Sequence, residues 1–386
     1  MTSLCFYFQV HQPLRLNRFT VFTKNTPYFD EARNKKYFER IARKCYLPTN
    51  KVLLDLIDQY GKDFKVAFSL TGVFVEQCKK FAPEVLDSFV ELSKTGSAEF
   101  LNETYYHSLA ALFSVEEFKK QIELHRSMVK DTFNQSPSVF RNTEAMYSNE
   151  IAKTIENLGY KGIITEGHES ILGWRSPNYL YQPKGCSKIV ALLRNYKLSD
   201  DIGFRFSAKW WKEHPLTADK YASWLSSCEG NCINLFIDYE TFGEHQWEDT
   251  GIFEFLKHLP NEVSKYKHLD FKTPSEVAKS YKHVGEIDVP FILSWADVQR
   301  DTSAWLENEM QKLAFEQMSK LEGLVKNDPE LLHVWRLMQT SDHFYYMCTK
   351  WWADGDVHKY FNPYDSPYDA FINYMNILQD IKRRIK

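Results

Sequence analysis

The chain has 386 residues, of which 44% are hydrophobic and 26% are charged, with a net charge of −3. This balance is typical of a globular protein and excludes a disordered or fibrous chain. The small negative charge and the short basic ending at residues 382–386 give no electrostatic footprint for nucleic acid. The 28 Phe, 22 Tyr and 10 Trp residues have two possible uses, core packing and stacking on flat ligands or sugar faces.

The cysteines and the N-terminal segment bear on where the protein is expected to reside in the cell. The seven cysteines include no two close pairs of the kind that a zinc site needs, so we expect free, mostly buried thiols in a reducing environment. The N-terminal segment lacks the regions of a signal peptide, and no stretch approaches the ~18 apolar residues of a membrane helix. We therefore expect a soluble, cytoplasmic protein with no membrane partner; no oligomeric state follows from the sequence.

Short apolar runs alternate with amphipathic stretches over the first two-thirds of the chain. The runs predict parallel strands that are covered on both faces. Pro83 is expected to break the first long helical stretch, residues 73–94. Strands that alternate with helices predict an α/β fold, either a barrel or a doubly wound sheet. The predicted strands are Leu4–Val10, Phe64–Leu70, Ala98–Leu101, Ser138–Arg141, Gly162–Thr165, Ile189–Arg194 and Ile233–Asp238.

The pattern changes after about residue 290, where apolar residues recur at helical spacing. Residues 304–326, 330–346 and 368–386 are predicted to be helices. Residues 351–367 between them are rich in Gly, Pro, Asp and aromatic residues and predict an ordered loop.

Polar residues stand where several predicted strands end. His11 and Gln12 follow the first strand, Glu144 follows the fourth, and Asp238 ends the seventh. The carboxyl ends of barrel strands meet on one face, so these side chains should lie together. Two partly buried carboxylates that face each other are what glycoside hydrolysis requires, since their environments separate their pKa values. The alternative is that each carboxylate is a structural ion-pair partner.

His11 leaves a metal site open as a further alternative. Such a site would need His11, Asp238 and His245 to converge, as in a deacetylase-like hydrolase. The chain has no HxH or HExxH motif, and it has no GxSxG, Walker A or GxGxxG motif either. We therefore predict no metal and no other cofactor.

The segment from Ser294 to Gln311 concentrates tryptophan and aspartate after the last predicted strand. One interpretation is a helix that packs by its Trp and is capped by Asp301. The other is an aromatic platform, with Trp295 and Trp305, that leans over the barrel mouth and binds substrate.

Five segments in order resemble the signature regions of glycoside hydrolase family 57, in particular its α-amylase branch. The resemblance spans nearly the whole chain. It implies an incomplete TIM-type (β/α)7 barrel over residues 1–285, followed by a C-terminal α-helical domain over residues 286–386 that closes the cleft. The matching segments are His11–Pro13, Gly96–His107, Phe140–Glu144, Asp238–His245 and Trp295–Trp305.

The resemblance also implies a function. It implies a retaining glycoside hydrolase that acts on α-1,4-glucans or maltooligosaccharides without metal. Glu144 matches the family nucleophile and Asp238 the general acid/base. The positions implied to bind substrate are His11, Gln12, Glu99, His245, Trp295, Asp297, Asp301 and Trp305. In the fifth segment the resemblance leaves open whether Asp297 or Asp301 faces the ligand.

Three alternatives stay open beside this hydrolase. They are a 4-α-glucanotransferase that uses the same site, a glucan-binding protein with little catalysis, and a metal-dependent polysaccharide deacetylase. The clustering of aromatic residues beside the carboxylate motifs predicts sugar stacking by Tyr105, Tyr106, Tyr239, Phe242, Trp247, Trp295 and Trp305.

Overall fold

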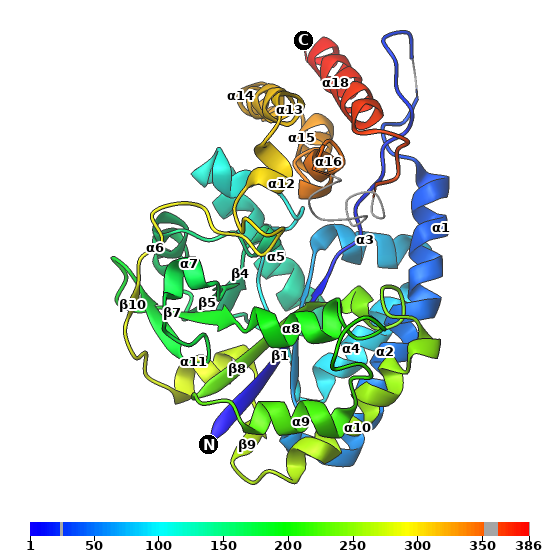
Figure 1. The fold of residues 1–386 in the computed structure, drawn as a ribbon. Coiled ribbons are helices and arrows are strands. Elements are labelled where there is room, and N and C mark those ends of the chain that lie inside the picture. The colour runs from blue at the N-terminus through cyan, green and yellow to red at the C-terminus, as the bar shows by residue number, and fades with distance from the viewer. Residues whose placement is uncertain (24–25, 351–361, 386) are drawn as a thin grey trace.

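Seven parallel strands form the centre of the fold in the computed structural model, which describes residues 1–23, 26–350 and 362–385 (Figure 1). Their order is β3-β2-β1-β8-β7-β5-β4. A single parallel bridge between Asn102 and Phe140 joins the end of β3 to β4, so the ring is not closed there by a continuous ladder. All seven predicted strands are confirmed: β1 Thr2–Val10, β2 Val66–Leu70, β3 Ala98–Phe100, β4 Val139–Arg141, β5 Gly162–Glu166, β7 Val190–Arg194 and β8 Cys232–Asp238.

Three further short strands lie beside this ring. β6 (Leu180–Pro183) pairs antiparallel with β7, and β10 (Glu286–Ile287) pairs with β6. β9 (Leu269–Phe271) pairs with the first residues of β1. The sequence pattern does not predict these three strands, which are two to four residues long.

Helices cover the outside of the ring, and every residue of β1 is buried, as expected for a parallel strand that is covered on both faces. The break predicted at Pro83 is confirmed, because one helix ends at Phe81 and the next begins at Pro83. The covering helices are α1 Glu31–Ile41, α2 Leu47–Tyr60, α3 Gly72–Phe81, α4 Pro83–Lys94, α5 Val115–Phe133, α6 Asn149–Asn157, α7 Glu169–Leu172, α8 Tyr196–Gly203, α9 Ala218–Ser226, α10 Ile252–Ser264 and α11 Pro274–Ser280.

The C-terminal helices gather at one end of the molecule (Figure 1). Their apolar core includes Trp305, Trp335 and Tyr374, and it also takes in Leu16 and Phe19 from the segment after β1. The domain boundary at residues 285/286 stays a prediction. The helices are α12 Ser303–Leu306, α13 Glu309–Ser319, α14 Glu322–Val325, α15 Pro329–Leu337, α16 Ser341–Tyr345 and α18 Pro367–Arg384.

Two of the three helices predicted here are broken. Residues 304–326 form three helices, α12, α13 and α14. Asn308 begins α13, where its side chain and that of Gln311 form a capping box. Residues 330–346 divide between α15 and α16. Most of the loop predicted at 351–367 lies outside the described residues, as do Trp351 and Trp352.

All seven cysteines are free thiols and five of them are buried, which confirms the expected state and burial of the thiols. None of the helices in the described ranges combines the length and the hydropathy that a bilayer crossing requires.

Candidate active site

A pocket of about 890 Å³ opens where the strands of the ring end. Residues that follow β1, β4 and β8 line it, together with residues from 295–305 and from α16. Eight of the predicted site residues line this pocket: His11, Gln12, Glu144, Asp238, His245, Trp295, Asp297 and Trp305.

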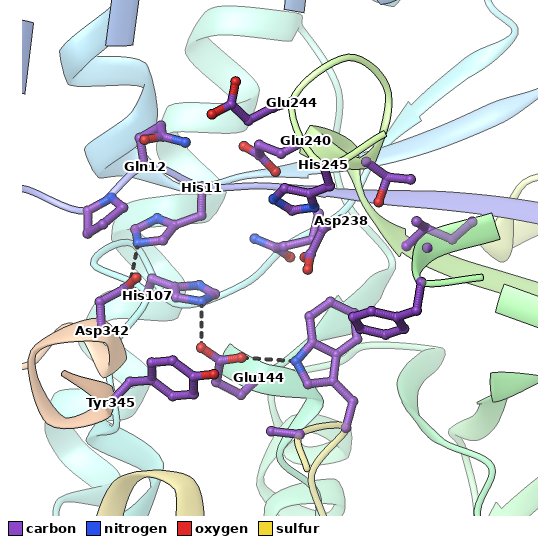
Figure 2. Close-up of a pocket in the computed structure, with 18 of the residues that line it drawn as sticks. His11, Gln12, His107, Glu144, Asp238, Glu240, Glu244, His245, Asp342 and Tyr345 are labelled. Atoms are coloured by element: carbon purple, nitrogen blue, oxygen red, sulfur yellow. Dashed lines mark hydrogen bonds and ion pairs between the residues drawn. The ribbon is translucent and has the colours of Figure 1, made fainter. Parts of the chain in front are cut away.

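The backbone at Glu144 is left-handed, with φ 55° and ψ 26°. A residue with a Cβ adopts this conformation at a cost, and such strain persists only where surrounding contacts enforce it. Here the Trp295 amide donates to the Glu144 carbonyl at 3.2 Å. The strained backbone position is thus the residue that carries the carboxylate after β4. The Glu144 side chain points toward the pocket (Figure 2).

Three donors hold the Glu144 carboxylate, and Figure 2 marks the contact with His107 as a dashed line. Trp295 Nε1 donates to Oε2 at 2.9 Å, and Ser341 Oγ donates to Oε1 at 2.8 Å. His107 Nε2 lies 3.3 Å from Oε1. Burial alone would raise the pKa of Glu144, but the His107 contact and the Arg141 charge hold that pKa below its ordinary value. Glu144 is therefore ionised at neutral pH.

Asp238 ends β8 and has the opposite protonation tendency. Burial, followed by the negative charge of Glu144, raises the pKa of Asp238 to about 6. Both carboxyl groups point into the same pocket in Figure 2. One carboxyl group is held ionised while the other retains its proton into the mildly acidic range.

Two stacked histidines connect Glu144 to the interior. His107 Nδ1 lies 3.2 Å from Glu103 Oε2, and Glu103 is fully buried. Burial opposes protonation of His107, yet its contacts with Glu103 and Glu144 raise its pKa to about 9. The His11 ring stacks on His107, and both burial and that neighbouring charge lower the pKa of His11. His11 Nε2 lies 3.2 Å from Asp342 Oδ2.

Two residues that follow Asp238 in the chain, Glu240 and His245, are neutral at neutral pH. Burial and the Asp238 charge raise the pKa of Glu240 to about 8, and Tyr46 donates to Glu240 Oε1 at 2.6 Å. Burial lowers the pKa of His245 to about 4. At neutral pH Glu240 and His245 therefore add no charge to this wall of the pocket.

Arginines fix the loop that carries Trp295. The Arg141 guanidinium lies 4.6 Å from the centre of the Trp295 ring, and that of Arg194 lies 5.7 Å away. The three Arg141 side-chain nitrogens have no hydrogen-bond partner in the described part of the chain. Arg300 donates to the Trp295 carbonyl and lies 3.5 Å from Glu166. The arginines thus cover at least one face of the indole. The ring edge that carries Nε1 contacts Glu144.

The structure also separates the two aspartates of the 295–305 segment. Asp297 lines the pocket, whereas Asp301 does not. Asp301 Oδ1 accepts from the Ser303 amide at 2.8 Å, at the start of α12. Asp301 therefore closes a turn just before α12, whose N-cap is Thr302 and lacks a side-chain cap hydrogen bond, so the predicted capping role of Asp301 is wrong.

Glu99 is not brought to the pocket either. Its carboxylate accepts from the Ser275 amide at 3.0 Å, at the start of α11. In the same motif Glu103 and His107 lie beyond β3, and His107 lines the pocket.

Four of the seven predicted sugar-stacking rings are wrong. Tyr239 and Phe242 are core residues with no exposed surface. Tyr105 bonds Glu76 and Tyr106 bonds His333, and neither ring lines the pocket. Only the tryptophans of that set line the pocket: Trp247, Trp295 and Trp305.

Sequence reasoning missed His107 and Ser341, which contact Glu144, and Asp342, which contacts His11. His107 falls inside the second motif, but nothing in its spacing distinguishes it from its neighbours. Ser341 and Asp342 belong to α16, 197 residues from Glu144 in the case of Ser341, and no motif marks them. No group of three His, Cys, Asp or Glu in the described ranges is placed to hold a metal ion.

Comparison with known proteins identifies the family. The sequence model of glycosyl hydrolase family 57 matches residues 5–290. A relative from Methanocaldococcus jannaschii, provisionally named an alpha-amylase, is 51% identical over 99% of this chain and 85% of its own length. The alpha-amylase of Pyrococcus horikoshii is 24% identical over 74% of this chain, which spans only 44% of that protein.

Solved structures share the fold. The 4-alpha-glucanotransferase of Thermococcus litoralis superposes with a TM-score of 0.69 at 17% identity, over 89% of this chain and 56% of that one. A family 57 branching enzyme of Thermococcus kodakaraensis gives a TM-score of 0.73 at 14% identity, over 99% and 90%. The family match and the M. jannaschii relative show that the chain belongs to glycosyl hydrolase family 57, as the five motifs predicted.

Proposed function

We propose that the protein is a retaining, α-amylase-like glycoside hydrolase that acts on α-1,4-glucans, with Glu144 as nucleophile and Asp238 as general acid/base. The observation that carries this proposal is the split between two carboxyl groups in one pocket. Three donors surround Glu144 and favour its charge, whereas burial and Glu144 itself favour the protonated form of Asp238. Such a split assigns base and acid roles to a carboxyl pair.

In the first step Asp238 donates its proton to the glycosidic oxygen. Glu144 attacks the anomeric carbon, the bond to the leaving chain breaks, and a glycosyl ester forms on Glu144. The Trp295 and Ser341 hydrogen bonds orient Glu144 for this attack. His107, protonated beside Glu144, compensates the charge of the carboxylate as it reacts.

In the second step the pKa of Asp238 falls. Its raised pKa depends partly on the negative charge of Glu144, which the glycosyl ester removes. The pKa of Asp238 therefore falls in the intermediate, and Asp238 becomes the base that takes a proton from water. Water attacks the anomeric carbon, and Glu144 leaves as a carboxylate.

Named relatives support the substrate class. The alpha-amylase names of the M. jannaschii and P. horikoshii proteins favour an α-glucan. The residues that would contact the glucan are His11, Gln12, His245 and Asp297, which all line the pocket. The Trp305 ring is buried in the core of the C-terminal helices and is not available for stacking on a sugar.

A 4-α-glucanotransferase is the second candidate, since a sugar hydroxyl in place of water would complete the same two steps. The pocket supports it, because it continues past the carboxyl groups to Tyr37 and Trp247, where an acceptor sugar could rest. This activity is the one named for the T. litoralis protein.

Product analysis on maltoheptaose tests the proposal. Shorter products alone indicate hydrolysis, whereas a ladder that includes longer products indicates transfer. Glu144→Gln and Asp238→Asn should each lower turnover by at least about 10³-fold. Glu99→Gln is a matched control, because Glu99 is a buried carboxyl outside the pocket. Full activity of Glu144→Gln, or unchanged maltoheptaose with the parent protein, would contradict the proposal.

A further inference from the structure

One arm of the pocket is rich in cations. Arg15, Arg40 and Lys44 line it together with the rings of Tyr37 and Trp247. They come from the segment after β1, from α1, and from the turn that follows α1, so the chain brings them together only in the fold. A neutral glucan offers no partner for a concentration of positive charge.

The two arginines converge on a single ring. The Arg15 guanidinium lies 4.1 Å from the centre of the Tyr37 ring, and the Arg40 guanidinium lies 4.8 Å from it. Lys44 Nζ lies 4.6 Å from the centre of the Trp247 ring. Cation–π contacts of this kind hold the charged groups in place without neutralising them.

Only one carboxylate in the described part of the arm compensates these cations. Glu244 pairs with Arg40 at 2.5 Å and lies 3.9 Å from Lys44. Three cations and one carboxylate leave a balance of 3 − 1 = +2. Glu240, the nearby second carboxyl, is buried against Tyr46 and adds no charge at neutral pH.

Arg15 is the cation that the protein leaves least satisfied. Its side chain is inside the pocket wall, with only 8% of the residue exposed. Its one side-chain hydrogen bond in the described ranges goes to the Pro13 carbonyl at 3.3 Å, and no carboxylate of those ranges pairs with it. A buried guanidinium is costly unless it is paired, so its presence here points to an anionic partner that arrives from outside.

The arm lies on the acid/base side of the pocket. Asp238, Glu240 and Glu244 belong to one short segment after β8, and Figure 2 places Glu244 beyond Glu240 as seen from Glu144. The general acid stands on the side from which the leaving chain departs and from which an acceptor enters. The cations are therefore placed to contact the acceptor rather than the sugar attached to Glu144.

We propose that this arm binds the phosphate monoester of a phosphorylated sugar, which serves as acceptor for the glycosyl group. A phosphate monoester carries about −1.5 to −2 at neutral pH, which matches the +2 balance better than a single carboxylate does. Paired guanidinium groups and an ammonium group are the donors that bind phosphate oxygens. The inference rests on the proposed function, because it assigns an acceptor to that same site.

The transfer step balances without another reactant. A hydroxyl of the sugar phosphate attacks the anomeric carbon of the glycosyl ester, and the bond from that carbon to Glu144 breaks. A new glycosidic bond forms, the hydroxyl proton goes to Asp238, and Glu144 is released as a carboxylate. The phosphate group is unchanged and serves only to bind the arm.

Calorimetric titration at pH 7.5 with glucose 6-phosphate, glucose and inorganic phosphate tests the binding. We expect glucose 6-phosphate to bind at least about tenfold more tightly than glucose, and the difference to shrink with added salt. Arg15→Gln should remove this difference. Lys44→Gln should reduce the difference, and because Lys44 is exposed this substitution should leave folding intact. Arg33→Gln is the control, since Arg33 lies on α1 near Asp30 and does not line the pocket.

Transfer is then measured with maltoheptaose as donor and glucose 6-phosphate as acceptor, by mass spectrometry of phosphorylated maltooligosaccharides. Their formation, lost in Arg15→Gln and kept in Arg33→Gln, supports the acceptor role. Equal binding of glucose and glucose 6-phosphate by the parent protein overturns it. Equal loss of phosphorylated products in Arg15→Gln and in Arg33→Gln overturns it as well. Tight binding of inorganic phosphate without phosphorylated products also overturns it. Turnover of maltoheptaose alone, recorded in the same variants, shows separately whether the proposed function holds.

Discussion

The rings of His11 and His107 stack with their centroids 4.1 Å apart and an interplanar angle of 22°. His107 carries a proton that Glu103 and Glu144 stabilise, whereas burial and the His107 charge keep His11 neutral. His11 in turn lies against Asp342 of α16. The pair joins the segment after β1, the segment after β3 and the C-terminal helices at one point, directly beside the proposed nucleophile.

Trp295→Phe separates two roles of this indole. The phenyl ring keeps an aromatic face but loses the N–H that donates to Glu144 Oε2. We expect kcat to fall by about 10- to 100-fold, as for loss of a hydrogen bond to a charged group, with KM little changed. Trp224→Phe, outside the pocket, is the control. An increase in KM with kcat preserved would show that Trp295 is instead a sugar platform.

The pH dependence of kcat/KM follows from the carboxyl pair. Asp238 must be protonated in the free enzyme, and its pKa is raised to about 6, so activity should fall as the pH rises through about 6. Glu144 must be ionised, and its lowered pKa places the acidic limb below the ordinary glutamate value. Rates with maltooligosaccharides between pH 3 and 9 measure both limbs. Activity that still rises between pH 6 and 8 would contradict the assignment of Asp238.

Ser341→Ala tests whether α16 completes the active site. Ser341 Oγ donates to Glu144 Oε1 at 2.8 Å, and the substitution removes that donor while it leaves the helix intact. We expect kcat to fall about tenfold and the acidic limb to move to higher pH, because the ionised form of Glu144 loses stabilisation. Ser319→Ala, on an exposed helix end, should change neither. An unmoved acidic limb would mean that Ser341 is only structural.

His107 should make stability depend on pH. Its pKa is about 9 in the folded protein and about 6.5 in an unfolded chain, so its contribution is complete below pH 6.5 and is lost as pH rises through about 9. His107→Gln should therefore lower the free energy of unfolding by roughly 2–3 kcal/mol at pH 6. The loss should be smaller at pH 9.5.

Urea unfolding at the two pH values provides this measurement. His258→Gln serves as its control, because His258 is on the surface, with 69% of its side chain exposed. The same loss at both pH values for His107→Gln would mean that the effect comes from packing and not from the proton.

The sequence predicts the ring well because its strands are marked locally. The run Leu4–Val10 is apolar except for Gln9 and is buried on both faces, so the pattern is complete within the run. The long predicted helix at 304–326 fails for an equally local reason. Its apolar spacing continues past Asn308, but the Asn308 and Gln311 side chains cap a new helix there.

The site is predicted only where chemistry stays within a motif. Glu144 and Asp238 follow strands, so their meeting at one rim follows from parallel topology. Glu99 lies outside the pocket, and a resemblance to a region does not say which of its side chains points inward. Ser341 approaches Glu144 through tertiary packing of α16, which no spacing along the chain encodes.

The most direct test of the central claim is a search for the covalent intermediate. Asp238→Asn should react with α-maltosyl fluoride, whose leaving group needs no proton, but should hydrolyse the intermediate slowly because the base is missing. Peptide mass spectrometry should then find a maltosyl ester on Glu144. A maltosyl ester on a different residue, or release of the β-anomer as first product with no ester formed, would contradict the account.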